Sequence, residues 1–150
     1  MKRILILILV LVTVNQLYAR LGETEEQIEG RYGKAVQTAP SNIESINEGV
    51  YEKNGYKIIV SFLNGKSCCE FFFHVPHRRF TKSEFQSLLD INTLGSKWLL
   101  IANNGNELDA CWQLANKGAT AFINHIYMQI STKEYNLRFH ESKTNDTQGF

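Results

Sequence analysis

The stretch YKIIVSFLNGKSCCEFFFHV, residues 56–75, decides the fold prediction because it joins two runs of strand-forming residues through an Asn-Gly pair. Asn64-Gly65 is the preferred dipeptide for a two-residue type I′ turn, in which both residues have a left-handed backbone. Such a turn sets the register of the flanking strands and pairs Leu63 with Lys66. We therefore predict an antiparallel hairpin over this stretch.

The predicted register separates the side chains of this hairpin by polarity, since successive strand residues point to opposite faces. The pairs on the apolar face are Phe62 with Ser67, Val60 with Cys69, Ile58 with Phe71, and Tyr56 with Phe73. The other face carries Lys57, Ile59, Ser61, Cys68, Glu70, Phe72 and His74. Ile59 and Phe72 are then apolar groups on a face of the hairpin that is expected to be exposed to water. They either lie under a covering segment or form part of a patch that binds a partner.

Two short helices are predicted from capping boxes, in which a Thr side chain and an acidic or amide side chain three residues later satisfy each other's backbone N–H groups. Thr24 and Gln27 open the first helix, which ends at Gly33. Thr81 and Glu84 open the second helix. Its inward stripe consists of Phe85, Leu88 and Leu89. Residues 34–47 are polar and are predicted to form a loop.

The second half of the chain contains a predicted strand over residues 98–102 and an alternating segment over 107–114. A three-residue loop at 116–118 would pair this segment with residues 119–126. In that register Trp112 faces Phe122 on the core side, and Asp109 faces His125 on the other side. A last strand over 134–140 would direct Tyr135, Leu137 and Phe139 inward.

These elements predict one α+β domain over residues 20–140. It consists of two short capped helices, each followed by antiparallel hairpin strands, with one sheet packed on the helices. Residues 141–150 are polar and are predicted to be a flexible tail.

The amino terminus resembles a cleavable secretory signal peptide. Lys2 and Arg3 precede an unbroken apolar run at residues 4–14, and a short polar-to-small exit ends at Ala19. The apolar run is too short for a membrane-spanning helix, which needs about 20 residues. We predict cleavage after Ala19 and a secreted or periplasmic protein, with an uncleaved anchor as the alternative.

Net charge argues against nucleic-acid binding. The chain has 16 Lys and Arg against 15 Asp and Glu, and loss of Lys2 and Arg3 with the signal leaves it near neutrality. It has no basic stripe to contact phosphates. No cofactor or metal is predicted, because Cys68 and His74 are about 20 Å apart along an extended strand.

Three cysteines in an exported protein allow at most one intramolecular disulfide. Cys68 and Cys111 both lie on predicted outward faces, so any disulfide should join these two. Neighbouring Cys68 and Cys69 point apart on a strand and are disfavoured as a pair.

A second candidate surface is polar. Asp109 and His125 face each other in the predicted register, with Tyr127 and Arg138 nearby if the last turn is tight. An Asp–His pair can transfer protons. The alternatives are a solvated sheet face, which is usual for antiparallel sheets, and a binding surface.

The opening segment Gly22-x-Thr24-x-x-Gln27-Ile28-x-x-Arg31-Tyr32-Gly33 resembles that of SmpA/OmlA lipoproteins and of the beta-lactamase inhibitor protein-like fold. It is more similar still to a group of uncharacterised secreted bacterial proteins, with scattered matches over residues 20–100. The resemblance implies a fold and an extracytoplasmic location, and it supplies no catalytic residues. Ala35 replaces the family proline and no lipobox is present, so a lipoprotein anchor is not implied.

The function predicted from the sequence is therefore a small exported module, not an enzyme, that binds a protein or peptide through a sheet face. The candidate binding residues are Ile59, Phe72, Asp109, His125, Tyr127 and Arg138. Two alternatives remain open: a small hydrolase that uses Asp109 and His125, and a structural protein of the cell envelope. The sequence leaves the oligomeric state open.

Overall fold

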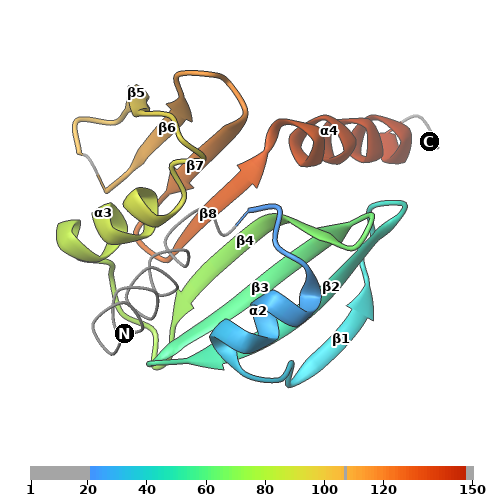
Figure 1. Cartoon of the computed structure of the whole chain (residues 1–150). Coiled ribbons are helices and arrows are strands. Elements are labelled where there is room, and N and C mark those ends of the chain that lie inside the picture. Colours follow the sequence, from blue (N-terminus) through green and yellow to red (C-terminus); the bar gives the residue numbers. More distant parts are fainter. Residues whose placement is uncertain (1–20, 107, 148–150) are drawn as a thin grey trace, which may run out of the picture.

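The computed structural model describes residues 21–106 and 108–147, which form one eight-stranded antiparallel sheet and three helices (Figure 1). In chain order the elements are α2 (Glu25–Tyr32), β1 (Gln37–Pro40), β2 (Ile46–Lys53), β3 (Tyr56–Leu63), β4 (Lys66–His74), α3 (Lys82–Ile91), β5 (Trp98–Asn103), β6 (Ala110–Leu114), β7 (Ala119–Ile123), β8 (Tyr127–Thr132) and α4 (Lys133–Thr147). The predicted signal peptide and its cleavage site after Ala19 lie outside the described residues.

The sheet is built from two meanders that meet in its centre. Its strand order is β1-β2-β3-β4-β8-β7-β6-β5, so each half of the chain contributes a helix followed by four consecutive strands. β4 and β8, the last strands of the two meanders, pair antiparallel and join the halves. This arrangement leaves β1 and β5 as the two edges of the sheet.

Both predicted capping boxes are confirmed. In α2, the Thr24 hydroxyl accepts from the backbone N–H of Gln27, and the Gln27 side chain accepts from Thr24 N–H at 2.9 Å. In α3, Thr81 and Glu84 make the same reciprocal pair. Both helices therefore begin where the sequence predicts.

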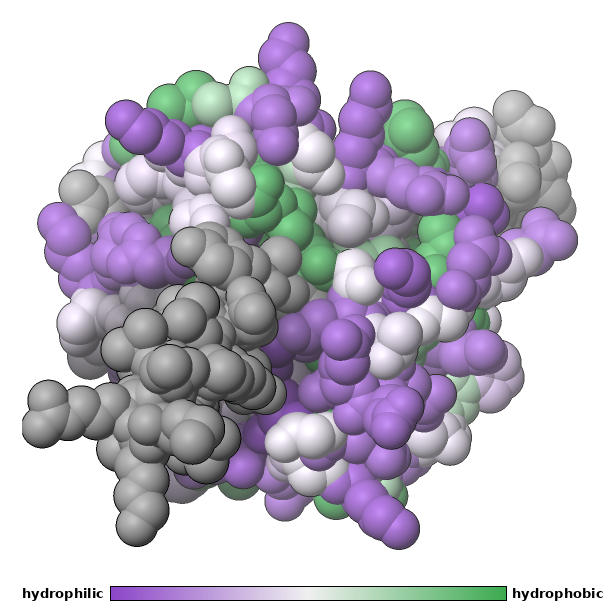
Figure 2. Space-filling model, in the orientation of Figure 1, coloured by the Kyte–Doolittle hydropathy of each residue, from purple (hydrophilic) through white to green (hydrophobic). Residues whose placement is uncertain are grey.

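α2 and α3 cover one face of the sheet, which we call the helix face. Figure 1 shows α2 crossing in front of β2 and β3. The core on this side combines helix residues with side chains from most of the strands. Its largest fully buried members include Ile28, Tyr51, Phe72, Phe85, Leu89, Leu114, Ile123, Met128 and Ile130. The outside of this part of the molecule is mainly hydrophilic, with only small apolar groups visible between polar side chains (Figure 2).

The opposite face, which we call the open face, has a smaller core at one end. Tyr135 of α4 packs there, and it is 4% exposed. The cluster that it joins consists of Ile43, Ile46, Leu63, Cys68, Cys69 and Tyr135. Apolar groups are thus buried on both sides of the sheet, in unequal amounts.

The predicted α+β fold class, with two short capped helices each followed by hairpin strands and one sheet packed on the helices, is wrong in its architecture. Helices and strands are both present, but the strands form one large sheet, and a third helix, α4, packs on its second face. The segment predicted as a last strand, residues 134–140, lies in α4. α4 also continues over residues 141–147, the start of the predicted tail.

The start of α4 explains why the strand predicted over residues 134–140 does not form. The Thr132 hydroxyl accepts from the backbone N–H of Tyr135 at 3.2 Å, which caps a helix directly after β8. The alternation of aromatic and aliphatic residues therefore does not mark a buried strand face. Leu137 and Phe139 are 53% and 40% exposed.

The predicted β3–β4 hairpin forms, but its register holds only next to the turn. Asn64 and Gly65 have φ of 52° and 73°, and Leu63 pairs with Lys66 as predicted. A β-bulge then intervenes, so that Ser61 pairs with Cys69. The extra residue is Cys68, whose thiol donates to the Ser61 carbonyl oxygen at 3.2 Å.

This bulge reverses the predicted faces of the three phenylalanines in β4, because a one-residue shift turns every later side chain over. Phe72 lies opposite Ile58 and is buried on the helix face, instead of standing outward beside Ile59. Phe71 and Phe73 take the open face. The prediction that Phe71 and Phe73 lie in the main core is therefore wrong.

In the β6–β7 hairpin, too, the strand register differs from the predicted one by one residue. Its loop contains four residues, 115–118, and Lys117 has the left-handed backbone, with φ of 58°, that was expected of Gly118. Trp112 consequently pairs with Ala121, and Phe122 pairs with Cys111. Phe122 lies on the open face and is 37% exposed, so its predicted core position is wrong.

Candidate functional site

Four aromatic side chains form a connected cluster on the open face, and we call it the open aromatic cluster. Its members are Phe71, Phe73, Phe122 and Tyr127. The Tyr127 ring is central, with centroid distances of 6.0 Å to Phe71, 5.8 Å to Phe73 and 6.0 Å to Phe122. Phe71 and Phe73 are stacked at 6.4 Å. These separations are typical of favourable aromatic pairs.

The register of three central strands brings these rings together. Phe73 of β4 lies opposite Tyr127 of β8, and Phe71 lies opposite Gln129. Gln129 in turn lies opposite Phe122 of β7. The cluster depends on both register shifts, because without them Phe71, Phe73 and Phe122 would point toward the helices.

The open aromatic cluster is accessible at its far end. Phe122 is exposed, while Phe71, Phe73 and Tyr127 are half-buried. Phe71 packs against the small core under α4, so the accessible part of the cluster runs away from that helix. Ile59, half-buried and opposite Phe71, extends the apolar surface onto β3.

The strand residues next to the cluster on β6, β7 and β8 are uncharged. Gln129 separates Phe71 from Phe122 in the ladder. Thr120 and Gln113 face each other on β7 and β6. On β3 the border is charged, because exposed Lys57 lies opposite Phe73. A partly exposed aromatic surface whose border is mostly neutral has the composition of a protein interface, in which aromatic residues are enriched and charges are depleted.

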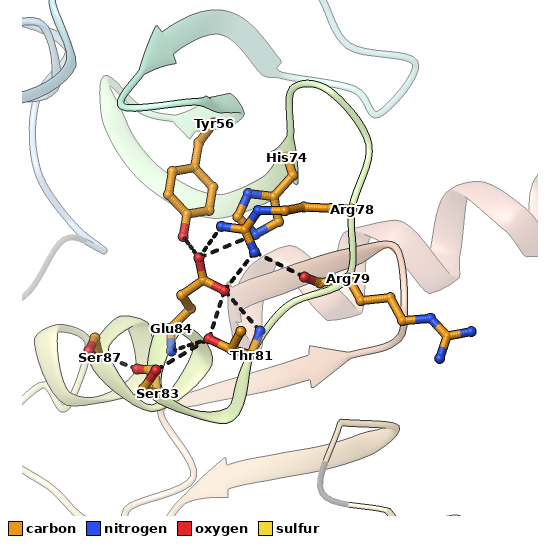
Figure 3. A network of polar contacts seen from close by, with 8 residues as sticks. All are labelled: Tyr56, His74, Arg78, Arg79, Thr81, Ser83, Glu84 and Ser87. Carbon is orange, nitrogen blue, oxygen red and sulfur yellow. Dashed lines mark hydrogen bonds and ion pairs between the residues drawn. The ribbon is translucent and has the colours of Figure 1, made fainter.

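A second candidate is a polar network around Glu84 (Figure 3). The Glu84 carboxylate accepts from the Tyr56 hydroxyl at 3.1 Å and from Arg78 Nη1 at 3.0 Å. It also accepts from the backbone N–H and the hydroxyl of Thr81, both at 2.8 Å. Arg78 first, and then the other donors, hold the Glu84 pKa well below its ordinary value against the opposing effect of burial.

His74 lies beside this network and is 3% exposed. Its ring stands between those of Tyr56 and Phe80, at centroid distances of 4.5 and 4.6 Å. Its Nε2 is 3.6 Å from Glu84 Oε1. Burial is the main cause that lowers the His74 pKa, and the Arg78 charge adds to it while Glu84 opposes it.

The arrangement suits a structural role better than proton transfer. Every donor around Glu84 stabilises its ionised form, and a carboxylate with a depressed pKa is a weak base. The network joins the connection between β4 and α3 to the start of β3 at Tyr56. It therefore positions α3 on the sheet.

The structure distributes the binding residues predicted from the sequence over separate places. Tyr127 and Ile59 lie on the open face, whereas Phe72 is 1% exposed in the main core. Arg138 lies on α4, where it pairs with Glu134 at 3.4 Å. These residues do not form one continuous surface.

The predicted Asp109–His125 pair does not form. β6 begins at Ala110, opposite Ile123, so that both members lie outside the paired strands. The Asp109 carboxylate accepts from the Asn104 side chain at 3.0 Å. His125 is exposed in the turn before β8.

The three cysteines are free thiols in this structure. Cys68 on β4 and Cys111 on β6 have β8 and β7 between them. Three strand spacings amount to about 14 Å, beyond the reach of a disulfide. The structure therefore does not bring the predicted pair together.

The sheet has a hollow of 580 Å³ near the start of α2, distant in sequence from the open aromatic cluster. Its lining consists of Glu25, Thr38, Ala39, Pro40, Ser45, Asn47, Glu48, Phe62, Asn64 and Gly65. It contains no histidine or cysteine. Within residues 21–106 and 108–147, no three His, Cys, Asp or Glu residues are grouped so that they could hold a metal ion.

Sequence analysis missed the open aromatic cluster because its residues come from three strands. Phe122 and Phe71 were assigned to the core, and only Tyr127 was a candidate. The sequence contained one usable signal, the run Phe71-Phe72-Phe73. Three consecutive large apolar residues in a strand must place at least one on the face opposite the main core.

No protein-family model matches the chain, and no curated protein matches it. Among solved structures, the chain is similar to a cysteine-rich secretory protein from Staphylococcus aureus subsp. aureus Mu50, with a TM-score of 0.48 and 12% identity over 77% of this chain and 45% of that one. It is also similar to an extracellular protein containing a SCP domain from Bacillus anthracis str. Ames, with a TM-score of 0.48 and 11% identity over 84% of this chain and 50% of that one.

The chain spans about half the length of these two proteins. Both are described as secretory or extracellular, and similarity of this degree assigns no activity to this chain. The resemblance to SmpA/OmlA lipoproteins and to the beta-lactamase inhibitor protein-like fold stays a prediction. In the described part of the chain, none of the helices combines the length and apolar character that crossing a membrane requires.

Proposed function

We propose that this protein is an exported binding module that holds a protein or peptide partner against the open aromatic cluster. The observation that carries the proposal is the contact of Phe71, Phe73 and Phe122 with one central tyrosine, Tyr127, at the partly exposed end of the open face. Rigid aromatic groups supply much contact area at a low entropy cost, which is why they dominate the binding energy of protein interfaces.

The charge of the surface defines the kind of partner. The cluster is bordered by neutral Gln113, Thr120 and Gln129 on β6 to β8, and by the exposed cation Lys57, which lies opposite Phe73, on β3. A partner should therefore present apolar or aromatic groups and uncharged hydrogen-bonding groups.

Catalysis has weaker support than binding. The hydrolase alternative needs Asp109 and His125 side by side, and the strand register leaves them outside the paired segments. The carboxylate of Glu84 is surrounded by donors and lies at a structural junction. No observation favours a second function.

Export belongs to the proposal, because the partner must share the compartment of this protein. Its support is the positive start at Lys2 and Arg3 followed by the apolar run at residues 4–14. Amino-terminal sequencing of the protein recovered from cell fractions tests this part. We expect Arg20 as the first residue outside the cytoplasm, and Met1 on a cytoplasmic protein would contradict it.

A photo-crosslinking amino acid at position 122 tests the binding surface in cells that produce the protein. We expect one discrete adduct, because Phe122 is the exposed member of the cluster. The same crosslinker at Gln86, exposed on α3, is the matched control and should give no such adduct. Phe73→Ser in the same chain should remove the adduct at position 122.

The result that would overturn the proposal is equally specific. Equal adduct patterns at positions 122 and 86 would mean that the open aromatic cluster has no preferred partner. An adduct at position 122 that persists undiminished in the Phe73→Ser variant would mean that the cluster does not bind it.

A further inference from the structure

The two edges of the sheet differ in how well they are protected against pairing with another strand. β1 has only four residues, and its last residue, Pro40, has no backbone N–H to donate. Short edges and proline are common protections of exposed strands. β5, at the other edge, has six residues, contains neither proline nor a charged side chain, and is protected by a β-bulge between Leu100 and Ala102.

β5 also exposes three consecutive large aliphatic residues. Leu99, Leu100 and Ile101 are 52%, 41% and 54% exposed. Successive strand residues point to opposite faces, so this edge is apolar on both sides of the sheet. Trp98 anchors the strand, because its indole N–H donates to the Leu89 carbonyl of α3 at 2.8 Å. The edge is therefore held in place from the helix side.

The sequence of β5 is self-complementary in an antiparallel arrangement. A two-fold axis at Leu100 would place this residue opposite itself in a second copy. Leu99 would then face Ile101. Apolar groups would meet apolar groups at these positions, and such cross-strand pairs stabilise a sheet.

We infer that β5 pairs with β5 of a second copy of this chain and joins two eight-stranded sheets into one. The β-bulge between Leu100 and Ala102 interrupts the regular ladder and limits the paired segment. A short interface of this kind is weak, so the dimer should form at micromolar and higher concentrations. The surface is separate from the open aromatic cluster, and the inference does not depend on the proposed function.

Sedimentation velocity of the purified protein over a wide concentration range tests the dimer. We expect a monomer at nanomolar concentration and a dimer at high micromolar concentration. Leu100→Lys should abolish the dimer, since lysine at an edge opposes strand pairing. Thr38→Lys places the same charge on the opposite edge and should leave the dimer unchanged.

A second measurement keeps the inference testable if Leu100→Lys fails to fold. Leu100→Cys in a Cys111→Ser background should form an intermolecular disulfide under mild oxidation, because the axis places position 100 opposite itself. Leu137→Cys, on the exposed side of α4, is the control and should stay largely uncrosslinked. A monomer at all concentrations, a dimer that survives Leu100→Lys, or equal crosslinking at positions 100 and 137 would overturn the inference.

Discussion

Ile58 of β3 lies directly opposite Phe72 of β4, and both side chains are buried on the helix face of the sheet. This pairing follows from the β-bulge at Cys68, which shifts the ladder by one residue after Phe62 and Ser67. The same shift turns Phe71 and Phe73 to the open face. One extra residue therefore decides both the main core and the proposed binding surface.

Truncation of two adjacent phenylalanines, one on each face of the sheet, should lower the stability of the protein by different amounts. Phe72→Ala should lower the free energy of unfolding by about 3–5 kcal/mol, because it leaves a cavity in a close-packed core. Phe71→Ala should cost less, about 1–2 kcal/mol, since this side chain is only half-buried. Chemical denaturation of both variants measures the difference. A larger loss for Phe71→Ala would contradict the bulge.

The thiols should differ in reactivity in the folded protein. Burial raises the pKa of Cys68 to about 12 and raises that of Cys69 well above its ordinary value. Thiolates are the reacting species, so both should be inert to a thiol reagent at pH 8. Cys111 is half-buried and should react slowly.

Mass spectrometry of the labelled, unreduced protein counts the modified thiols and checks this expectation. We expect one modified thiol in the native protein and three after unfolding. A disulfide between Cys68 and Cys111 would instead leave one reactive thiol after unfolding. Rapid labelling of all three cysteines in the native state would mean that the small core under α4 is not closed.

Removal of the Glu84 charge should make the stability of the fold less sensitive to acid. A carboxyl group with a lowered pKa in the folded state contributes stability above its ordinary value of 4.5, and this contribution is lost as the pH falls below that value. Glu84→Gln should cost about 1–3 kcal/mol at neutral pH through its weakened charge-assisted hydrogen bonds. It should also flatten the loss of stability between neutral pH and acid.

Denaturation curves over a pH series measure both effects. Glu44→Gln, at an exposed position away from the network, is the matched control and should follow the parent protein. If the two variants lose stability in acid to the same extent, the contacts of Glu84 with Arg78 and Thr81 do not stabilise the fold.

Protonation of His74 should oppose folding. Because the pKa of His74 is lower in the folded state than its ordinary value of 6.5, the unfolded chain binds the proton more readily. Stability should therefore decrease as the pH falls through about 6.5. His74→Phe keeps an aromatic ring between Tyr56 and Phe80 and should remove this part of the pH dependence.

The control for this prediction is His77→Gln, since His77 is exposed in the connection before α3. Thermal unfolding between pH 5 and 8 should show the same slope for the control and the parent protein. An unchanged slope in His74→Phe would assign the pH dependence to another group.

The local signals in the sequence were sufficient for several elements. Thr24 with Gln27 and Thr81 with Glu84 cap helices within four residues of chain, so nothing distant alters them. Asn64-Gly65 makes its turn for the same reason. A second Asn-Gly turn, at Asn54-Gly55, connects β2 to β3 and carries the same signal, which the sequence analysis did not use.

Short-range rules could not locate the open aromatic cluster, because the faces of β4 and β7 depend on single extra residues. Alternation predicts which residues share a face, but it does not show where a strand bulges. The bulge at Cys68 places this residue and Cys69 in the small core with Tyr135, which is more than sixty residues away in the chain. The pairing of β4 with β8 then completes the surface around Tyr127.

The sequence alone therefore determined the starts of α2 and α3, the tight turn at Asn64-Gly65 and the amphipathic stripe of α3, because each depends on interactions within one turn of chain. Only the tertiary structure decided the strand registers, the packing of α4 on the second face of the sheet and the open face. These features depend on contacts between distant segments, whose burial outweighs the weak local preference for one register or one secondary structure.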